Sequence, residues 1–150
     1  MAVYTHFDGK SGLVDAMVAE GYASLKAKLD EAADANAYGD VLVSVAVGYR
    51  KWALAHPTQY QAMYTSLVPG FTPTEPTLAL GDISFGAHRD RVQSELGLDA
   101  ATADSVARHL WASVHGHVAF EILYGAPGDE AVRTEAFVQA ARWMLKGVES

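Results

Sequence analysis

Hydrophobic residues recur every three or four positions along this chain, and no segment alternates as a half-buried β-strand would. The pattern therefore predicts an all-α protein of about six helices. The expected helices cover residues 10–34, 40–55, 57–67, a less regular stretch between 77 and 96, residues 100–124, and residues 129–148. We find no internal repeat, no low-complexity tract and no linker that would separate two folded domains.

Proline and glycine mark the expected helix boundaries. Pro57 ends one helix, because the residue before a proline is disfavoured in helical geometry, and suits the first turn of the next. Residues 68–76, VPGFTPTEP, hold three prolines and a glycine and are predicted to form a loop. Residues 125–128, GAPG, separate the last two expected helices. Further capping residues are expected at Gly97, Asp99 and Asp129.

The last two helices carry more apolar surface than one buried stripe requires. Such a helix is either central to a monomer or shared between subunits. Small residues allow close backbone approach, and we expect these two helices to form a four-helix bundle with a second chain, which makes the protein a homodimer. The residues that widen the apolar surface are Ala112, Gly116, Ala119, Ala140, Ala141 and Trp143.

Composition narrows the choice of partners. The 150-residue chain is long enough for one well-buried core, and its 18 acidic against 11 basic residues give a net charge of −7. This charge disfavours nucleic-acid binding by the body of the protein, since affinity for phosphates depends on Lys and Arg. The chain has no cysteine and no apolar run long enough to span a bilayer. We therefore expect a cytoplasmic protein that does not bind membranes.

The first residues resemble part of a known DNA-binding family. Tyr4, His6, Phe7, Lys10 and Leu13 occur in the order Tyr-x-His-Phe-x-x-Lys-x-x-Leu. This element resembles the end of the helix-turn-helix and the start of the next helix in TetR-family transcription regulators. The resemblance implies that Tyr4, His6 and Lys10 contact DNA phosphates when the DNA-binding module is present.

The same resemblance implies a division of the chain. Residues 1–9 would be the remnant of the helix-turn-helix domain, and residues 10–150 the ligand-binding and dimerisation domain. The two helices that precede the recognition helix in the family do not occur in the sequence. We therefore expect operator DNA to be a partner only where an intact N-terminal domain exists. In the family, residues corresponding to 10–34 couple effector binding to the spacing of the DNA-binding modules.

A second motif resembles one branch of that family. Trp111, His115 and Gly116 supply a Trp-x-x-x-His-Gly element, and residues 49–64, YRKWALAHPTQYQAMY, agree with the branch's aromatic helix and His-Pro break. The resemblance implies a regulator, expected to be a repressor, with a hydrophobic or aromatic small-molecule effector and no cofactor. The predicted ligand-binding residues are Tyr49, Trp52, Tyr60, Met63, Tyr64, Phe85, Trp111 and His115.

Other functions remain open at this point. His117 and Glu121 have the i, i+4 spacing of two metal ligands, with His88 or His109 as a third, but such pairs more often form surface contacts, and we predict no metal site. A small all-α enzyme that uses His115 or His117 is less favoured, since no nucleophile or phosphate-binding motif occurs. A further alternative is a stand-alone small-molecule-binding or dimerisation protein.

Overall fold

A computed structural model describes residues 9–65 and 68–149, and this part of the chain contains α-helices and no β-strand. The predicted all-α fold is confirmed. No helix among these residues is long and apolar enough to cross a membrane. The helices are α2 (Gly9–Ala35), α3 (Val41–Ala55), α4 (Pro57–Tyr64), α5 (Glu75–Leu96), α6 (Ala100–Tyr124) and α7 (Glu130–Glu149).

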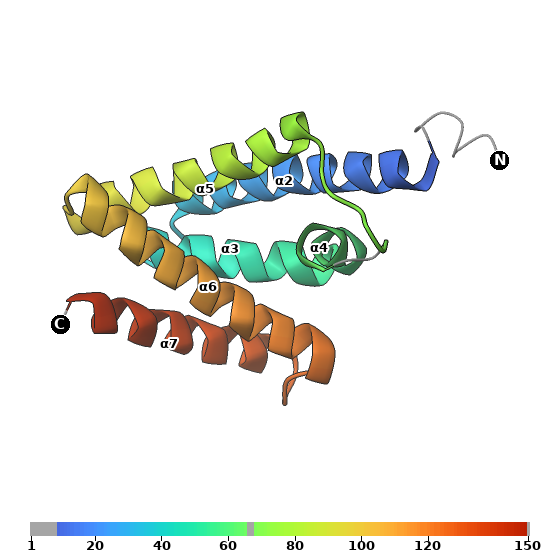
Figure 1. Ribbon diagram of the computed structural model, residues 1–150. Helices are drawn as coiled ribbons and strands as arrows, with labels where there is room; N and C mark the ends of the chain where they lie inside the picture. The colour runs from blue at the N-terminus through green and yellow to red at the C-terminus, as the bar shows by residue number, and fades with distance from the viewer. Residues whose placement is uncertain (1–8, 66–67, 150) are drawn as a thin grey trace.

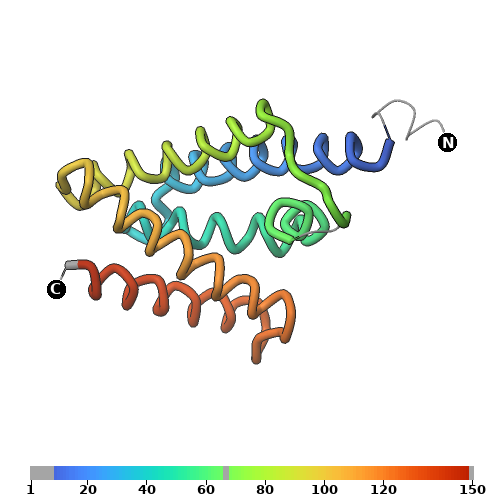
Figure 2. The backbone as a smooth tube through the Cα atoms, viewed as in Figure 1, coloured from blue at the N-terminus to red at the C-terminus, as the bar shows by residue number. Residues whose placement is uncertain are grey.

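The helices lie in three levels with α3 at the centre (Figure 1). Helices α2 and α5 lie side by side on one side of α3, and α6 and α7 lie on the other. Helix α6 runs obliquely across the molecule from the end of α5 to the start of α7 (Figure 2). Because α3 contacts every other helix, all residues from Leu42 to Arg50 are buried. The hydrophobic core therefore surrounds α3 on all sides.

Local capping explains where several helices begin and end. The Asp40 carboxylate accepts a hydrogen bond from the Val43 backbone N–H (3.0 Å), and Asp99 accepts from two N–H groups of the first turn of α6. Asp129 does the same for α7 through the Val132 N–H (3.0 Å). These contacts confirm the N-caps predicted for α6 and α7. The predicted cap at Gly97 is also confirmed, since this residue ends α5 in the left-handed conformation (φ 64°).

Helix α5 differs from the prediction in two respects. It begins at Glu75, inside the segment expected to be a loop, because Pro76 falls in the first helical turn, where a missing N–H costs no hydrogen bond. The inward face of α5 also differs from a regular apolar stripe, since the large hydrophobic residue Ile83 points away from the core and is 55% exposed. The buried residues of this helix are Thr77, Ser84, His88 and Val92. Three of them are polar, so hydrophobic spacing was a poor guide to this face.

Contacts at both ends and in the middle hold α2 against α5. The Asp15 carboxylate accepts hydrogen bonds from the Thr74 backbone N–H (2.8 Å) and from the Thr77 hydroxyl (2.9 Å), so α2 supplies the missing cap of α5. At the other end Asp30 pairs with Arg91 (2.9 Å). Between them the Tyr22 ring packs on Gly81, where an added Cβ would lie 3.0 Å from the ring.

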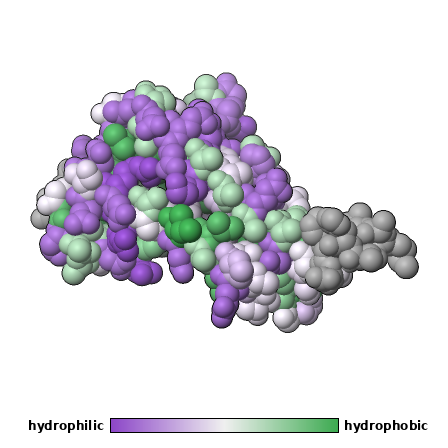
Figure 3. All heavy atoms as spheres, turned by 90° about the horizontal axis from the view of Figure 1, so that it is seen from above, coloured by the Kyte–Doolittle hydropathy of each residue, from purple (hydrophilic) through white to green (hydrophobic). Residues whose placement is uncertain are grey.

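The outer surface of these two helices is mostly hydrophilic, with a small hydrophobic group near its middle (Figure 3). Helix α2 also approaches α3 closely. A Cβ added at Gly48 would lie 2.7 Å from the Ala32 Cβ, so the glycine is what permits this packing distance.

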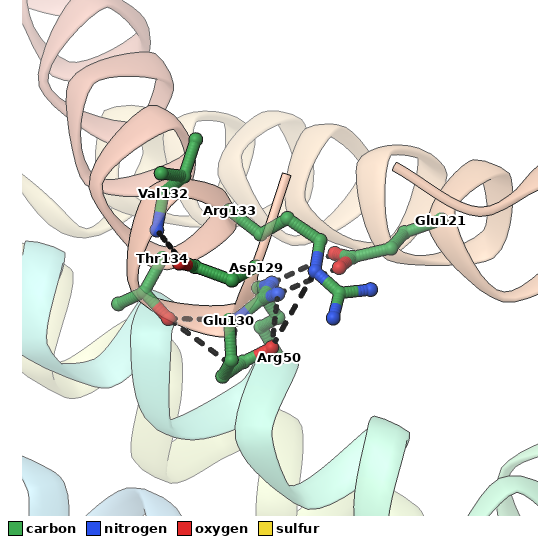
Figure 4. A network of polar contacts seen from close by, with 7 residues as sticks. All are labelled: Arg50, Glu121, Asp129, Glu130, Val132, Arg133 and Thr134. Atoms are coloured by element: carbon green, nitrogen blue, oxygen red, sulfur yellow. Dashed lines mark hydrogen bonds and ion pairs between the residues drawn. The ribbon is translucent and has the colours of Figure 1, made fainter. Parts of the chain in front are cut away.

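A buried arginine joins α3 to α6 and α7. The Arg50 side chain is 0% exposed, and its guanidinium forms two hydrogen bonds with the Glu121 carboxylate (2.6 and 2.7 Å). It also pairs with Glu130 (2.9 Å) and donates to the Thr134 hydroxyl (3.1 Å) at the start of α7 (Figure 4). These partners raise the pKa of Arg50 despite burial, so it remains charged.

The two carboxylates of this network should differ in their contributions to stability. Glu121→Gln is expected to lower the free energy of unfolding by about 3 kcal/mol or more, because it leaves a buried guanidinium without its bidentate partner. Glu130→Gln is the matched control, and its side chain is 59% exposed. It should cost about 1 kcal/mol or less. Urea unfolding followed by circular dichroism measures both, and equal losses would contradict this ranking.

Candidate functional site

A small apolar cavity, here called the inner chamber, lies where α3 meets α2, α5, α6 and α7. Its volume is about 30 Å³, which suits a water molecule but is far below the roughly 300 Å³ of a pocket for a drug-sized ligand. The walls are Leu29, Leu42, Val45, Ala46, Tyr49, His88, Leu110, Trp111, Val114, Ala141, Met144 and Leu145. The chamber therefore has to enlarge before it can hold anything larger than a small molecule of a few atoms.

Three tyrosines surround one histidine beside the chamber. The hydroxyls of Tyr49 and Tyr60 each lie 3.0 Å from His115 Nδ1, and the Tyr60 hydroxyl is also 3.3 Å from the His115 carbonyl oxygen. The Tyr64 ring contacts the imidazole edge-on at 4.5 Å between centroids. We call these four residues the tyrosine–histidine cluster. It joins α3 and α4 to α6.

Burial sets the protonation states in this cluster. It raises the pKa of Tyr60 to about 12 and moves the pKa values of Tyr49 and Tyr64 further upward, so all three hydroxyls are neutral and can donate. It also lowers the pKa of His115, which favours the neutral imidazole. In either neutral tautomer Nδ1 makes one well-aligned hydrogen bond, so Tyr49 and Tyr60 compete for it, and the Tyr60 hydroxyl can donate to the His115 carbonyl instead.

Trp111 links the cluster to the chamber. Its indole contacts the Tyr49 ring edge-on (5.4 Å between centroids), and it also packs against Phe85 (6.0 Å) and His88 (5.2 Å). The structure thus brings together six of the eight predicted ligand-binding residues in one aromatic group. Of these, only Tyr49 and Trp111 line the chamber itself.

The other two predicted ligand-binding residues lie toward α2. The Trp52 indole N–H donates to the Ser24 hydroxyl (3.0 Å), and its ring stacks on His56. The Met63 side chain fills the space beside Gly21. Both residues therefore contribute to packing between α2 and the α3–α4 pair in this conformation.

The structure describes one of the three residues predicted to contact DNA phosphates. Lys10 lies exposed in the first turn of α2. Tyr4 and His6 lie outside the described residues.

His88 is the residue that sequence analysis undervalued, since it was considered only as a metal ligand. It is 7% exposed, lines the inner chamber, and its Nε2 lies 3.2 Å from the Ala107 carbonyl oxygen. Burial lowers the pKa of His88 to about 4, so the ring is neutral at pH 7. To find His88 from the sequence, one would have had to predict correctly which residues of α5 face the core.

The histidine–glutamate pair on α6 does not form a metal site. Glu121 is engaged by Arg50, and the His117 ring packs edge-on against Phe137 (5.0 Å between centroids). Within residues 9–65 and 68–149, no three His, Cys, Asp or Glu side chains gather closely enough to hold a metal ion.

Comparison with known proteins places this arrangement in a family. Residues 42–143 match the family described as "Tetracyclin repressor-like, C-terminal domain". The chain belongs to the TetR family. The matched segment runs from α3 into α7 and so contains the tyrosine–histidine cluster, Trp111 and most of the chamber wall.

Curated relatives of this chain are named as transcriptional regulators. The chain is 28% identical over 142 residues to the HTH-type transcriptional regulator Rv1816 of Mycobacterium tuberculosis, and equally to the regulator Mb1846 of Mycobacterium bovis. The aligned region covers 91% of this chain and 60% of each relative. The chain therefore spans less than two thirds of the length of the curated relatives that it matches.

Solved structures support the fold. A protein of unknown function from Rhodococcus sp. RHA1 superimposes with a TM-score of 0.73 at 23% identity, over 95% of this chain and 74% of that protein. The crystal structure of SCO4313 superimposes with a TM-score of 0.69, also at 23% identity, over 93% of this chain and 77% of the other. Both have the arrangement of helices described above.

Burial of His88 predicts a pH dependence of stability. Between about pH 6.5 and pH 4 the unfolded chain binds a proton at this residue that the folded chain does not, so folding stability should fall as the pH falls through this range. The full effect is roughly 3 kcal/mol. Urea unfolding at several pH values should show a shallower slope for His88→Gln than for wild type. His109→Gln, at an exposed position of α6, is the control and should leave the slope unchanged.

Proposed function

We propose that residues 10–150 form the effector-binding and dimerisation body of a TetR-like transcriptional repressor, with residues 1–9 as the end of its DNA-binding domain. Operator DNA is a partner where an intact N-terminal domain is present. The observation that carries the proposal is the inner chamber, an apolar space bordered by five helices with neutral hydrogen-bonding groups beside it. An apolar space with few polar groups suits a hydrophobic or aromatic effector.

The packing of α2 supports a route from the chamber to DNA. Leu29 of α2 forms part of the chamber wall, and Asp15, Tyr22 and Asp30 hold the same helix against α5. An effector that enlarges the chamber must move at least one of these walls. Because α2 follows the segment that resembles the helix-turn-helix, its displacement would change the spacing of two DNA-binding modules in a dimer.

The outer face of α6 and α7 supports a homodimer. Phe120 and Tyr124 on α6 are 68% and 76% exposed, and Trp143 on α7 is 65% exposed. Phe120 and Tyr124 lie with small residues, among them Ala112 and Gly116, along a surface groove of α6. Large exposed apolar residues on neighbouring helices are typical of an interface, and a two-fold axis would pair the same stripe of both chains.

The effector site can be tested by filling the chamber. Ala46→Leu adds volume to its wall, whereas Ala79→Leu adds the same volume on the exposed side of α5. Neutral aromatic compounds that raise the melting temperature of wild type should raise that of Ala79→Leu equally and should fail to raise that of Ala46→Leu. Each shift is the difference between the melting temperatures of one protein with and without compound. It therefore does not include the destabilisation that overpacking itself causes in a variant. Equal shifts in all three proteins would place binding elsewhere.

The dimer can be tested on the outer face of α6. Phe120→Glu should convert a species of about twice the 16.0 kDa chain mass into a monomer, because a charge in the apolar interface lacks a partner. Leu78→Glu, on an exposed position of α5, should leave the mass unchanged. Sedimentation velocity distinguishes these outcomes. A wild-type monomer at micromolar concentration would refute this interface.

A further inference from the structure

A residue of the chamber wall, His88, carries a buried hydrogen-bonding atom that no described residue satisfies. Among the wall residues of the chamber, Tyr49, His88 and Trp111 carry polar groups, and the Trp111 indole N–H can only donate. The Tyr49 hydroxyl is engaged by His115 Nδ1 at 3.0 Å. His88 contacts the Ala107 carbonyl through Nε2, and a carbonyl only accepts, so Nε2 carries the hydrogen. The remaining nitrogen, Nδ1, is then an acceptor, and it is buried without a partner among the described residues.

An unsatisfied acceptor in an apolar cavity is unfavourable unless something donates to it. We propose that His88 is a recognition residue of the inner chamber, whose Nδ1 accepts a hydrogen bond from a hydroxyl or N–H group of an otherwise apolar, uncharged ligand. This inference rests on the proposed function and specifies the chemical class of its effector. His88 supplies the polar contact that fixes the ligand's orientation, and the aliphatic walls hold the rest of it.

The surroundings exclude charged ligands. A carboxylate offers no proton and would face the lone pair of Nδ1, and none of the described residues in the chamber wall is an arginine or lysine that could neutralise an anion. A cationic ligand would be desolvated without a carboxylate, since no Asp or Glu of residues 9–65 and 68–149 lines the chamber. A neutral alcohol, phenol or N–H heterocycle meets both conditions.

Size limits the first probes. The volume of about 30 Å³ accommodates one water molecule, which can donate to Nδ1 in the absence of ligand. A ligand would replace that water and push the walls apart. Met144 is the most adaptable wall residue, because its unbranched side chain has three rotatable bonds. Single-ring compounds require the least expansion and are therefore the appropriate probes.

Phenol and toluene form a matched pair, since they have similar shapes and only phenol donates a hydrogen bond. We would measure their dissociation constants by calorimetry for wild type, His88→Gln and the surface control His109→Gln. The glutamine at 88 can keep a donor toward the Ala107 carbonyl but places no acceptor at the Nδ1 position. Phenol should bind His88→Gln about tenfold more weakly than wild type, while toluene changes less than twofold. His109→Gln should match wild type for both.

Nitrogen NMR of wild type provides a second measurement that needs no variant. Addition of phenol should shift the His88 Nδ1 resonance, and addition of toluene should leave it near its starting position. If both compounds bind but His88→Gln weakens neither, or the Nδ1 resonance responds equally to both, the role of His88 is overturned and the chamber survives as a ligand site. If neither compound binds wild type at millimolar concentration, the inference and the proposed effector site both fail.

Discussion

The burial of Arg50 constrains the whole arrangement of helices. A guanidinium removed from water needs carboxylates in good geometry, and no residue of α3 itself provides one. Glu121 from the end of α6 and Glu130 from the first turn of α7 must therefore both reach α3. This requirement brings the α6–α7 turn against the central helix. It also fixes the position of α6 along α3, which places Trp111 over the chamber and His115 against the tyrosines.

Two environments of different polarity result from this arrangement. The tyrosine–histidine cluster satisfies most of its hydrogen-bonding groups internally, whereas the chamber is almost entirely apolar and holds the free acceptor of His88. Tyr49 and Trp111 belong to both. A movement of Tyr49 that enlarges the chamber would also move its hydroxyl relative to His115 Nδ1. The tyrosine–histidine cluster is thus placed to respond when a ligand occupies the inner chamber.

Sequence spacing predicted the helices well because most of them bury a regular apolar stripe. The stripe of α3, from Leu42 to Ala53, is buried as expected, and the caps at Asp99 and Asp129 follow from local side-chain chemistry. Helix α5 was less predictable, because its inward face consists of Thr, Ser and His residues whose burial depends on partners in α2 and α6.

The same limit applies to the candidate site. Aromatic residues on α3, α4 and α6 were expected to gather, and Tyr49, Tyr60 and Trp111 do lie together. The pairing of Arg50 with Glu121 joins residues far apart in the chain, and no local pattern indicates it. Trp52 lies outside the aromatic group, where its indole N–H donates to Ser24, a contact that no local pattern indicates either. Tertiary partners, rather than residue type, decide these positions.

The close approach of Gly48 to Ala32 has a mechanical consequence. With the two backbones this near, sliding of α3 along α2 would cause a clash, so we expect a displacement of α3 to carry α2 with it. The opposite side of α3 presents Ala46 to the chamber. Outward pressure on that side is therefore transmitted to α2 as a displacement of the whole pair and is not absorbed by slippage between them.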